Sequence, residues 1–371
     1  MKIGVPREIK SNEYRVGLIP AGVSEYVRNG HEVVVQAGAG AGSAIPDAEY
    51  ESVGATILPT AEDVWEAADM IVKVKEPLPD EYELMQPNQI VYTYFHLAAV
   101  PDLADALLER EVTAVAYETI QLADGSLPLL EPMSEVAGRM AIQVGARCLE
   151  REHGGKGILL GGVPGTKRAK VSIIGGGVVG TNAAKMAVGM GAQVTILDVD
   201  LPRLRYLDDI FGNQIETLHS SREMIAKKVT DVDLLVGAVL IPGAKAPHLV
   251  TRDHITAMPE GSVVVDVSVD QGGCIETCHP TTHEDPTYVV DDVVHYCVAN
   301  MPGAVARTST YALNNATLPY GVAIANKGIE EAAAMDKALR LGVNTYGGAC
   351  VHDVVADSLE LEFTPFEQML N

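Results

Sequence analysis

The chain has 371 residues, of which 47% are hydrophobic, and a formal net charge of −23. Its length predicts two domains of ordinary size. An acidic surface of this strength repels nucleic acid and anionic lipid, and no apolar run approaches the roughly 18 residues that would span a membrane.

The N-terminal residues and the cysteines indicate where the protein works. Residues 1–8 are charged and lack the apolar core of a secretion signal. The 5 cysteines are an odd, scattered set, which is typical of reduced thiols in a cytosol. Among them, Cys274 and Cys278 lie near His279 and His283, but this spacing matches no common zinc site. We therefore expect a cytoplasmic protein without a structural metal.

The first third of the chain alternates between predicted strands and helices. Strands are expected over residues 3–5, 32–36, 55–58, 70–74, 90–94 and 112–116. Helices are expected over residues 20–29, 48–53, 61–67 and 101–110, the third of them capped by Thr60. This alternation predicts a doubly wound sheet of mainly parallel strands. Because no three-glycine fingerprint follows these strands, we expect this half of the chain to hold the substrate.

Polar side chains follow three of these strands. Arg15 precedes the helix expected to begin at Pro20, while Lys75 follows strand 70–74 and His96 follows strand 90–94. In open α/β sheets, ligands bind outside the carboxyl ends of the strands. The residues alone leave two interpretations open, since Lys75 is also compatible with a surface lysine and His96 with a buried structural histidine.

A glycine fingerprint follows a long helix expected over residues 136–152, which connects the domains. Residues 170–174 read as a buried strand, and Gly175-x-Gly177-x-x-Gly180 then opens a helix over residues 178–190. The first glycine permits the tight turn, the second lets a pyrophosphate approach the backbone, and the third lets helix and strand pack closely. The helix N-terminus favours the anion. This sequence of elements predicts a dinucleotide-binding Rossmann domain.

An acidic residue at the end of the next strand bears on the choice of dinucleotide. Residues 193–197 form that strand, and Asp198 follows it, placed to accept hydrogen bonds from the ribose hydroxyls of NAD. A carboxylate here would repel the 2′-phosphate of NADP. Arg203 and Arg205 lie close enough in sequence to weaken this argument.

The remaining chain continues the βα alternation and then becomes helical. Further strands are expected at residue 215 and over residues 233–237, 262–266 and 295–298, with Asp270 beyond the third of these. Helices are expected over residues 308–326, with a kink at Pro319, and over residues 330–341 and 351–361. No sheet is predicted among these helices. We expect them to return to the N-terminal domain, which makes that domain discontinuous.

Eight motifs together resemble the alanine dehydrogenases, in the family that also holds the NAD-binding subunit of transhydrogenase. They are GVPREIK and EYRV at residues 4–10 and 13–16, MIVKVKEP at 70–77, YFH at 94–96, MSEVAGRMA at 133–141, DVSVDQGG at 266–273, HEDPT at 283–287 and ANMPGA at 299–304. They run in order over nearly the whole chain, which makes the resemblance far more specific than the glycine fingerprint.

The resemblance implies a fold and a reaction. The fold is α/β, with two doubly wound Rossmann-like domains: residues 1–130 with 306–371 for substrate, and residues 131–305 for NAD. The reaction is the reversible oxidation of L-alanine to pyruvate and ammonia with NAD, in a homohexamer. Arg15 and Lys75 would bind the substrate, and His96 and Asp270 would be catalytic. Cofactor contacts would come from Ser134, Gly175, Gly177, Val178, Val179, Gly180, Asp198, Arg203, Ser220, Val239, Leu240, Val267, Asn300 and Met301. Position 279 is histidine where some relatives carry a cofactor-contacting arginine, so one contact is in doubt.

Three alternatives remain beside this interpretation. The NAD-binding subunit of a proton-translocating transhydrogenase has a similar fold but needs membrane partners, whereas this sequence ends in an acidic stretch at residues 357–362. A lysine-forming saccharopine dehydrogenase shares the layout but takes a larger substrate. An NAD-sensing regulatory protein would bind the cofactor without turnover.

Overall fold

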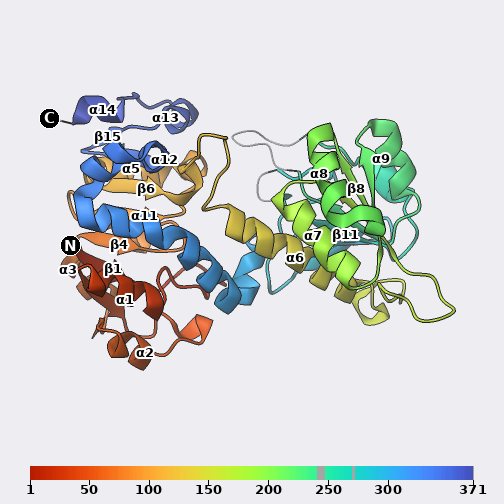
Figure 1. Ribbon diagram of the computed structural model, residues 1–371, viewed down its shortest axis with the longest axis horizontal. Coiled ribbons are helices and arrows are strands. Elements are labelled where there is room, and N and C mark those ends of the chain that lie inside the picture. Colours follow the sequence, from red (N-terminus) through yellow and green to blue (C-terminus); the bar gives the residue numbers. More distant parts are fainter. Residues whose placement is uncertain (240–246, 270–271, 371) are drawn as a thin grey trace. The chain divides into compact units, whose positions relative to one another are not determined.

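The computed structural model describes residues 1–239, 247–269 and 272–370 of the chain. The chain divides into two compact units, one formed by Met1–Met133 with Val305–Asn371 and the other by Ser134–Ala304. Each unit contains one sheet, and parallel strands dominate both sheets. The predicted α/β fold class is confirmed, including the return of the C-terminal residues to the first unit (Figure 1).

The first unit contains an eight-stranded sheet in the order β15-β14-β6-β5-β4-β1-β2-β3. Its strands are β1 (Lys2–Val5), β2 (Glu32–Gln36), β3 (Thr56–Leu58), β4 (Met70–Val72), β5 (Ile90–Thr93), β6 (Thr113–Ala116), β14 (Val343–Tyr346) and β15 (Ala349–Cys350). Strands β1 to β6 pair in parallel, and β14 and β15 pair antiparallel at the edge beyond β6. The order reverses between β1 and β4, and such a switch point is where open α/β sheets bind ligands.

Helices cover both faces of this sheet. They are α1 (Pro20–Arg28), α2 (Asp47–Ser52), α3 (Ala61–Ala67), α4 (Pro79–Tyr82), α5 (Pro101–Glu109), α11 (Ala306–Met335), α12 (Lys337–Gly342), α13 (Asp353–Leu359) and α14 (Phe366–Met369). Helices α1 and α11 pack against each other, and Figure 1 shows α11 lying across the sheet. An apolar cluster that includes the fully buried Trp65 packs α3 and α5 against the strands. The Thr60 cap is confirmed, since Thr60 and Asp63 form a capping box at the start of α3.

The C-terminal segment differs from the prediction, which expected helices and no strand. Strands β14 and β15 extend the first sheet, and the Thr345 hydroxyl donates to the Val112 carbonyl at 2.7 Å. Two strands of four and two residues are too short to show a clear alternation in the sequence. Inside α11 the backbone leaves helical geometry at Gly328 (φ 76°), nine residues beyond the proline at which a kink was expected.

The second unit contains a seven-stranded sheet in the order β12-β13-β11-β10-β7-β8-β9. Its strands are β7 (Lys170–Ile174), β8 (Gln193–Asp198), β9 (Ile215–His219), β10 (Leu234–Gly237), β11 (Val263–Asp266), β12 (Thr287–Val290) and β13 (Val293–Tyr296). Its helices are α6 (Glu131–Cys148), which begins in the first unit, α7 (Val178–Gly189), α8 (Leu201–Phe211), α9 (Arg222–Val229) and α10 (Arg252–Thr256). Apart from the antiparallel edge strand β12, this is the strand order of a dinucleotide-binding Rossmann sheet, with the switch point between β7 and β10.

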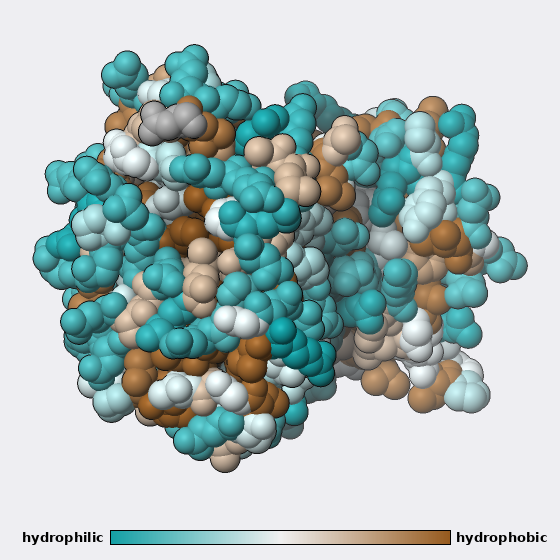
Figure 2. Space-filling model, turned by 60° about the vertical axis from the view of Figure 1, so that its left-hand side comes forward, coloured by the Kyte–Doolittle hydropathy of each residue, from teal (hydrophilic) through white to brown (hydrophobic). Residues whose placement is uncertain are grey.

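The strongly acidic composition predicts a hydrophilic surface. Figure 2 shows one face on which polar side chains dominate, with smaller hydrophobic patches between them. No helix in the described ranges is both long enough and apolar enough to cross a membrane. All 5 cysteines are free thiols, in agreement with the prediction.

Candidate active site

The predicted substrate residues follow three neighbouring strands of the first sheet. Arg15, Lys75 and His96 lie in the connections after β1, β4 and β5, and these strands are adjacent in the order β5-β4-β1. All three connections leave the carboxyl edge of the sheet beside its switch point. The fold thus brings these connections together from positions up to 81 residues apart in the sequence.

Arg15 is held by a carboxylate that the sequence analysis did not single out. Its Nε and Nη2 donate to the two oxygens of Glu13 at 2.7 and 2.6 Å, and Nη1 lies 3.1 Å from the sulfur of Met133. Burial acts to lower the pKa of Arg15, but the bonds to Glu13 outweigh it and raise the pKa. The forked pair therefore fixes the plane of a charged guanidinium.

Lys75 is fixed through its backbone, while its ammonium group is destabilised. Its carbonyl accepts from the Thr93 hydroxyl at 2.9 Å, and its N–H points to Glu8 at 3.4 Å. Burial, and next the positive charge of Arg15, lower the pKa of Lys75. An anion bound beside the Lys75 ammonium would offset both its burial and this repulsion. A small carboxylate fits this requirement.

A buried ion-pair cluster lies at the start of the Lys75 connection. The fully buried ammonium of Lys73 lies 3.2 Å from Glu8 and 2.9 Å from Glu81. Burial acts to lower the pKa of Lys73, but the two carboxylates outweigh it and raise the pKa. Glu8 also accepts from the backbone N–H of Val74 at 2.6 Å. The cluster therefore ties the N-terminal segment to the connection that carries Lys75.

His96 has an unusual backbone and an exposed side chain. Its φ is 53° and its ψ is 40°, in the left-handed region that residues other than glycine rarely adopt. Its N–H donates to Glu118 at 2.5 Å, and its ring stacks on Tyr94 with centroids 6.1 Å apart. Glu118 was also missed in the sequence, although it follows the end of β6, where the strand-end rule would have found it.

The glycine fingerprint adopts the predicted strand-turn-helix geometry in the second unit. Gly175 has a φ of 101°, which only glycine adopts easily. A Cβ on Gly180 would lie 1.8 Å from the Gly175 carbonyl oxygen, so α7 approaches the turn too closely for any side chain. A Cβ on Gly177 would meet nothing within 4 Å. Open space at the N-terminus of α7 suits a pyrophosphate.

Asp198 and Arg203 both bind the fingerprint turn. Asp198 ends β8 and accepts from the Gly176 N–H at 2.6 Å and from the Asp200 N–H at 2.9 Å. The guanidinium of Arg203 donates to the Gly176 carbonyl at 2.5 Å and to the Thr181 hydroxyl at 2.7 Å. Arg203 is therefore engaged within the protein, and the carboxylate of Asp198 stands beside the glycine turn.

The other predicted cofactor residues follow carboxyl ends of the second sheet or begin its helices. Ser134 lies in α6, Val178 and Val179 begin α7, Ser220 follows β9, Val239 follows β10, Val267 follows β11, and Asn300 and Met301 follow β13. Leu240 and Asp270 lie outside the described residues. His279 stacks on Tyr288 with ring centroids 3.9 Å apart, so its ring is held in place.

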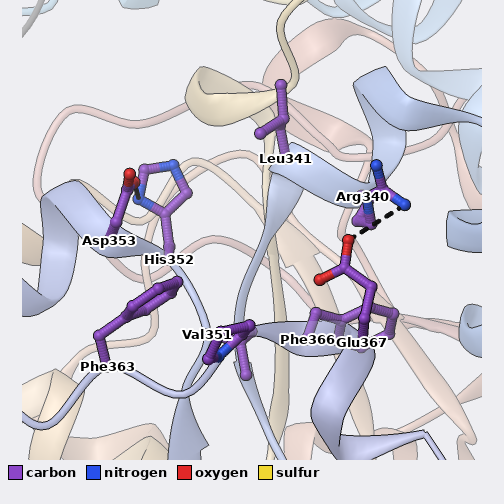
Figure 3. Close-up of a pocket in the computed structure, with 9 residues that line it drawn as sticks. Arg340, Leu341, Val351, His352, Asp353, Phe363, Phe366 and Glu367 are labelled. Carbon is purple, nitrogen blue, oxygen red and sulfur yellow. Dashed lines mark ion pairs between the residues drawn. The ribbon is translucent and has the colours of Figure 1, made fainter.

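A separate cavity of about 180 Å³ lies in the first unit, between α12, β15, α13 and α14. Figure 3 shows Arg340 and Glu367 at its wall, joined by an ion pair of 3.2 Å, with Phe366 beside Glu367 and Phe363 on the opposite side, near His352. None of the predicted site residues lines this cavity. It is therefore distinct from the candidate active site.

Comparison with known proteins identifies relatives over the full chain. Residues 4–137 match the family model described as the alanine dehydrogenase/PNT N-terminal domain, and residues 141–353 match that of the C-terminal domain. The alanine dehydrogenase of Methanococcus maripaludis is 59% identical, with all of both chains covered. That of Bacillus subtilis is 58% identical, covering 100% of this chain and 98% of the relative.

Solved structures agree with these sequence matches. A structure of L-alanine dehydrogenase superposes with a TM-score of 0.95 at 54% identity, covering 97% of this chain and 99% of the other. A transhydrogenase structure from Sinorhizobium meliloti superposes with a TM-score of 0.82 at 26% identity, covering 95% of this chain and 99% of the other. Of these two structures, the L-alanine dehydrogenase is more similar to this chain in both sequence identity and TM-score.

Proposed function

The chain belongs to the alanine dehydrogenase/PNT family, and we infer from its full-length relatives that it is an enzyme, a dehydrogenase that oxidises L-alanine to pyruvate and ammonia reversibly. The observation that carries this inference is the arrangement of Arg15, Lys75 and His96 after three adjacent strands at a switch point. Two cations and a histidine suit a small amino acid with one carboxylate.

The dinucleotide that we propose is NAD. The space before Gly177 and the N-terminus of α7 would take the pyrophosphate, and Asp198 would accept from the ribose hydroxyls. A carboxylate at this position disfavours a 2′-phosphate, and Arg203 is engaged by the glycine turn and Thr181. Bound there, NAD would supply the hydride acceptor for oxidation at the alanine Cα.

Arg15 and Lys75 have the binding role in the proposed mechanism. The guanidinium, held in plane by Glu13, places a fixed positive charge for the substrate carboxylate. Lys75 would bind the same end of the substrate or its carbonyl oxygen, and the bound anion would offset its repulsion by Arg15. Fixing Cα in this way lowers the entropic part of the barrier, for which effective molarities reach roughly 10⁵ M or more.

His96 has the proton-transfer role in the proposed mechanism, and Asp270 assists it. Oxidation of alanine gives an iminium, to which water adds before ammonia leaves, so protons move in several steps. His96 can both take and give a proton, and its exposed ring can exchange protons with solvent. For Asp270, which lies outside the described residues, we propose orientation of the attacking water and stabilisation of the iminium cation.

We also propose that the enzyme is a homohexamer in the cytoplasm, as the family resemblance implies. Sedimentation velocity of the purified protein measures the assembly directly. A monomer or dimer across the working concentration range would contradict the hexamer.

The test of the function is NADH absorbance on mixing the purified protein with NAD and L-alanine at mildly basic pH. NADP and other amino acids are the matched controls. Rapid formation of NADH with alanine supports the reaction, the cofactor and the small pocket together. NADH binding without turnover would contradict the proposal and favour a transhydrogenase-type carrier or an NAD sensor.

A further inference from the structure

The backbone of His96 is held in a conformation that histidine does not favour. With φ at 53° and ψ at 40° the residue lies in the left-handed region, where a Cβ meets its own backbone. Such conformations persist only where the surroundings over-determine them, and they cluster at functional sites. Something near His96 therefore stabilises this backbone.

Glu118 supplies that stabilisation. It lies in the short helical turn Tyr117–Thr119 directly after β6, and β6 pairs with β5, which leads to His96. One carboxylate oxygen accepts from the N–H of His96 at 2.5 Å and from that of Phe95 at 3.1 Å, and the other oxygen lies 3.3 Å from the Phe95 nitrogen. Two successive N–H groups point at one anion, which is the geometry of a backbone anion nest.

The imidazole itself has little else to hold it. Within the described parts of the chain its ring nitrogens take no hydrogen bond, and its ring neighbour is Tyr94, stacked at 6.1 Å. Tyr94 is anchored in turn, since its hydroxyl donates to the Leu129 carbonyl at 2.5 Å. The direction in which the imidazole leaves the chain is therefore set by the backbone that Glu118 binds.

We propose that Glu118 is a positioning residue for His96: its carboxylate holds the left-handed backbone that aims the imidazole at the substrate. This rests on the proton-transfer role proposed for His96 above. Glu118 acts through the backbone and does not itself exchange a proton with the substrate. Its loss lets the backbone relax to a commoner conformation and moves the imidazole, and a misplacement of about 1 Å can cost on the order of 100-fold in rate.

A carboxylate with the same chemistry and no role at the site provides the matched control. Both oxygens of Asp47 accept from the N–H of Gly38, at 2.9 and 3.1 Å, and Gly38 is also left-handed, with a φ of 75°. Asp47 is half-buried in the same unit, like Glu118. Its connection carries none of the predicted site residues. Asp47→Ala therefore measures what a carboxylate that binds a left-handed loop backbone contributes to stability alone.

The experiment is a double-mutant cycle on kcat for alanine oxidation. Glu118→Ala and Glu118→Met should each lower kcat by about 10-fold or more, with the dissociation constant of NADH unchanged. Glu118→Gln, which keeps an acceptor oxygen, should recover most of the rate. Asp47→Ala should leave kcat within about twofold even where it lowers the melting temperature equally. In the His96→Ala background, adding Glu118→Ala should change the residual rate less than about twofold.

Each contrary result identifies which proposal fails. If Glu118→Ala slows the His96→Ala variant as much as it slows the native enzyme, Glu118 acts independently of His96 and the positioning role is wrong. A kcat equal to that of the native enzyme in both Glu118→Ala and Glu118→Met would also show that the positioning role is wrong. If His96→Ala alone leaves kcat unchanged, the role of His96 is wrong and the positioning role falls with it. Should Glu118→Ala fail to fold, Glu118→Met completes the cycle, since its side chain fills similar space without an acceptor.

Discussion

Replacing Lys73 by methionine tests whether the buried ion-pair cluster stabilises the first unit. The substitution keeps the length of the side chain but removes the ammonium that lies 3.2 Å from Glu8 and 2.9 Å from Glu81. Breaking a buried pair by deleting one partner costs about 3–5 kcal/mol, because the other charge stays buried. In the variant, Glu8 still accepts a hydrogen bond from the Val74 N–H, and Glu81 still accepts one from the Leu78 N–H. We therefore expect the lower end, a loss of about 3 kcal/mol in unfolding free energy at pH 8.

The loss should depend on pH in a definite direction. Burial already raises the pKa of Glu8, against the opposing effect of Lys73, and removing Lys73 raises it further. The unfolded pKa of a glutamate is about 4.3. When the folded pKa lies above this, the protonated carboxyl stabilises the folded state at pH values below about 4.3. This stability is lost as pH rises through the folded pKa. The difference between the native protein and Lys73→Met should therefore be small near pH 4–5 and grow toward pH 8.

The assay is urea denaturation followed by tryptophan fluorescence at one fixed protein concentration. Trp65 is the single tryptophan and is fully buried in the first unit, so it reports on the unit that holds Lys73. The control is Lys327→Met, which breaks the exposed pair with Glu331 and should cost less than about 0.5 kcal/mol. A cost below about 1 kcal/mol for Lys73→Met at pH 8, or a difference that does not narrow at acid pH, would refute the reasoning.

Three further predictions concern the two proposed binding sites. The proposed role of Lys75 is to bind the substrate anion through its ammonium, and burial and Arg15 lower the pKa of that group. The KM for pyruvate should therefore rise with pH as Lys75 deprotonates. Lys75→Arg, charged to above about pH 12, should abolish the rise, and an equal rise in this variant would contradict the role. Gly180→Ala places a Cβ 1.8 Å from the Gly175 oxygen and should weaken NADH binding at least about tenfold in a fluorescence titration, unchanged affinity being the contrary result. Asp198→Ala should reduce the preference in kcat/KM for NAD over NADP about tenfold or more, and an unaltered ratio would show that another group sets it.

Local patterns in the sequence predict most of the described elements, because hydrophobic runs and caps act over a few residues. The expected strand 32–36 and helix 61–67 have the bounds that the structure shows. Helix α6 begins at Glu131, five residues before the expected start, since the helix runs through a proline in its first turn. Strands β14 and β15 were missed because pairing with β6, distant in sequence, defines them.

Some residues of the candidate site can be predicted from the sequence, and others only from the fold. Strand ends and motif resemblance point to Arg15, Lys75 and His96, because position after a parallel strand is visible in the sequence. Of their partners, Glu118 follows the end of β6 and could have been found by the same rule, whereas Glu13 follows no strand directly, and an acidic residue in a sequence with net charge −23 looks like any other surface carboxylate. Only the fold shows which carboxylates turn inward and bind a site residue.

Strand β14 is synthesised long after β6, the strand with which it pairs. Strand β6 ends at Ala116 and its antiparallel neighbour β14 begins at Val343, about 230 residues later. At 5–20 residues per second, a ribosome needs roughly 10 to 45 s to cover that distance. The continuous second unit can complete its sheet in this interval, while β6 presents an open edge of the kind to which other chains add. Nascent chains are therefore most exposed to aggregation and most dependent on chaperones before the last strands are released, and truncation near the C-terminus leaves that edge open permanently.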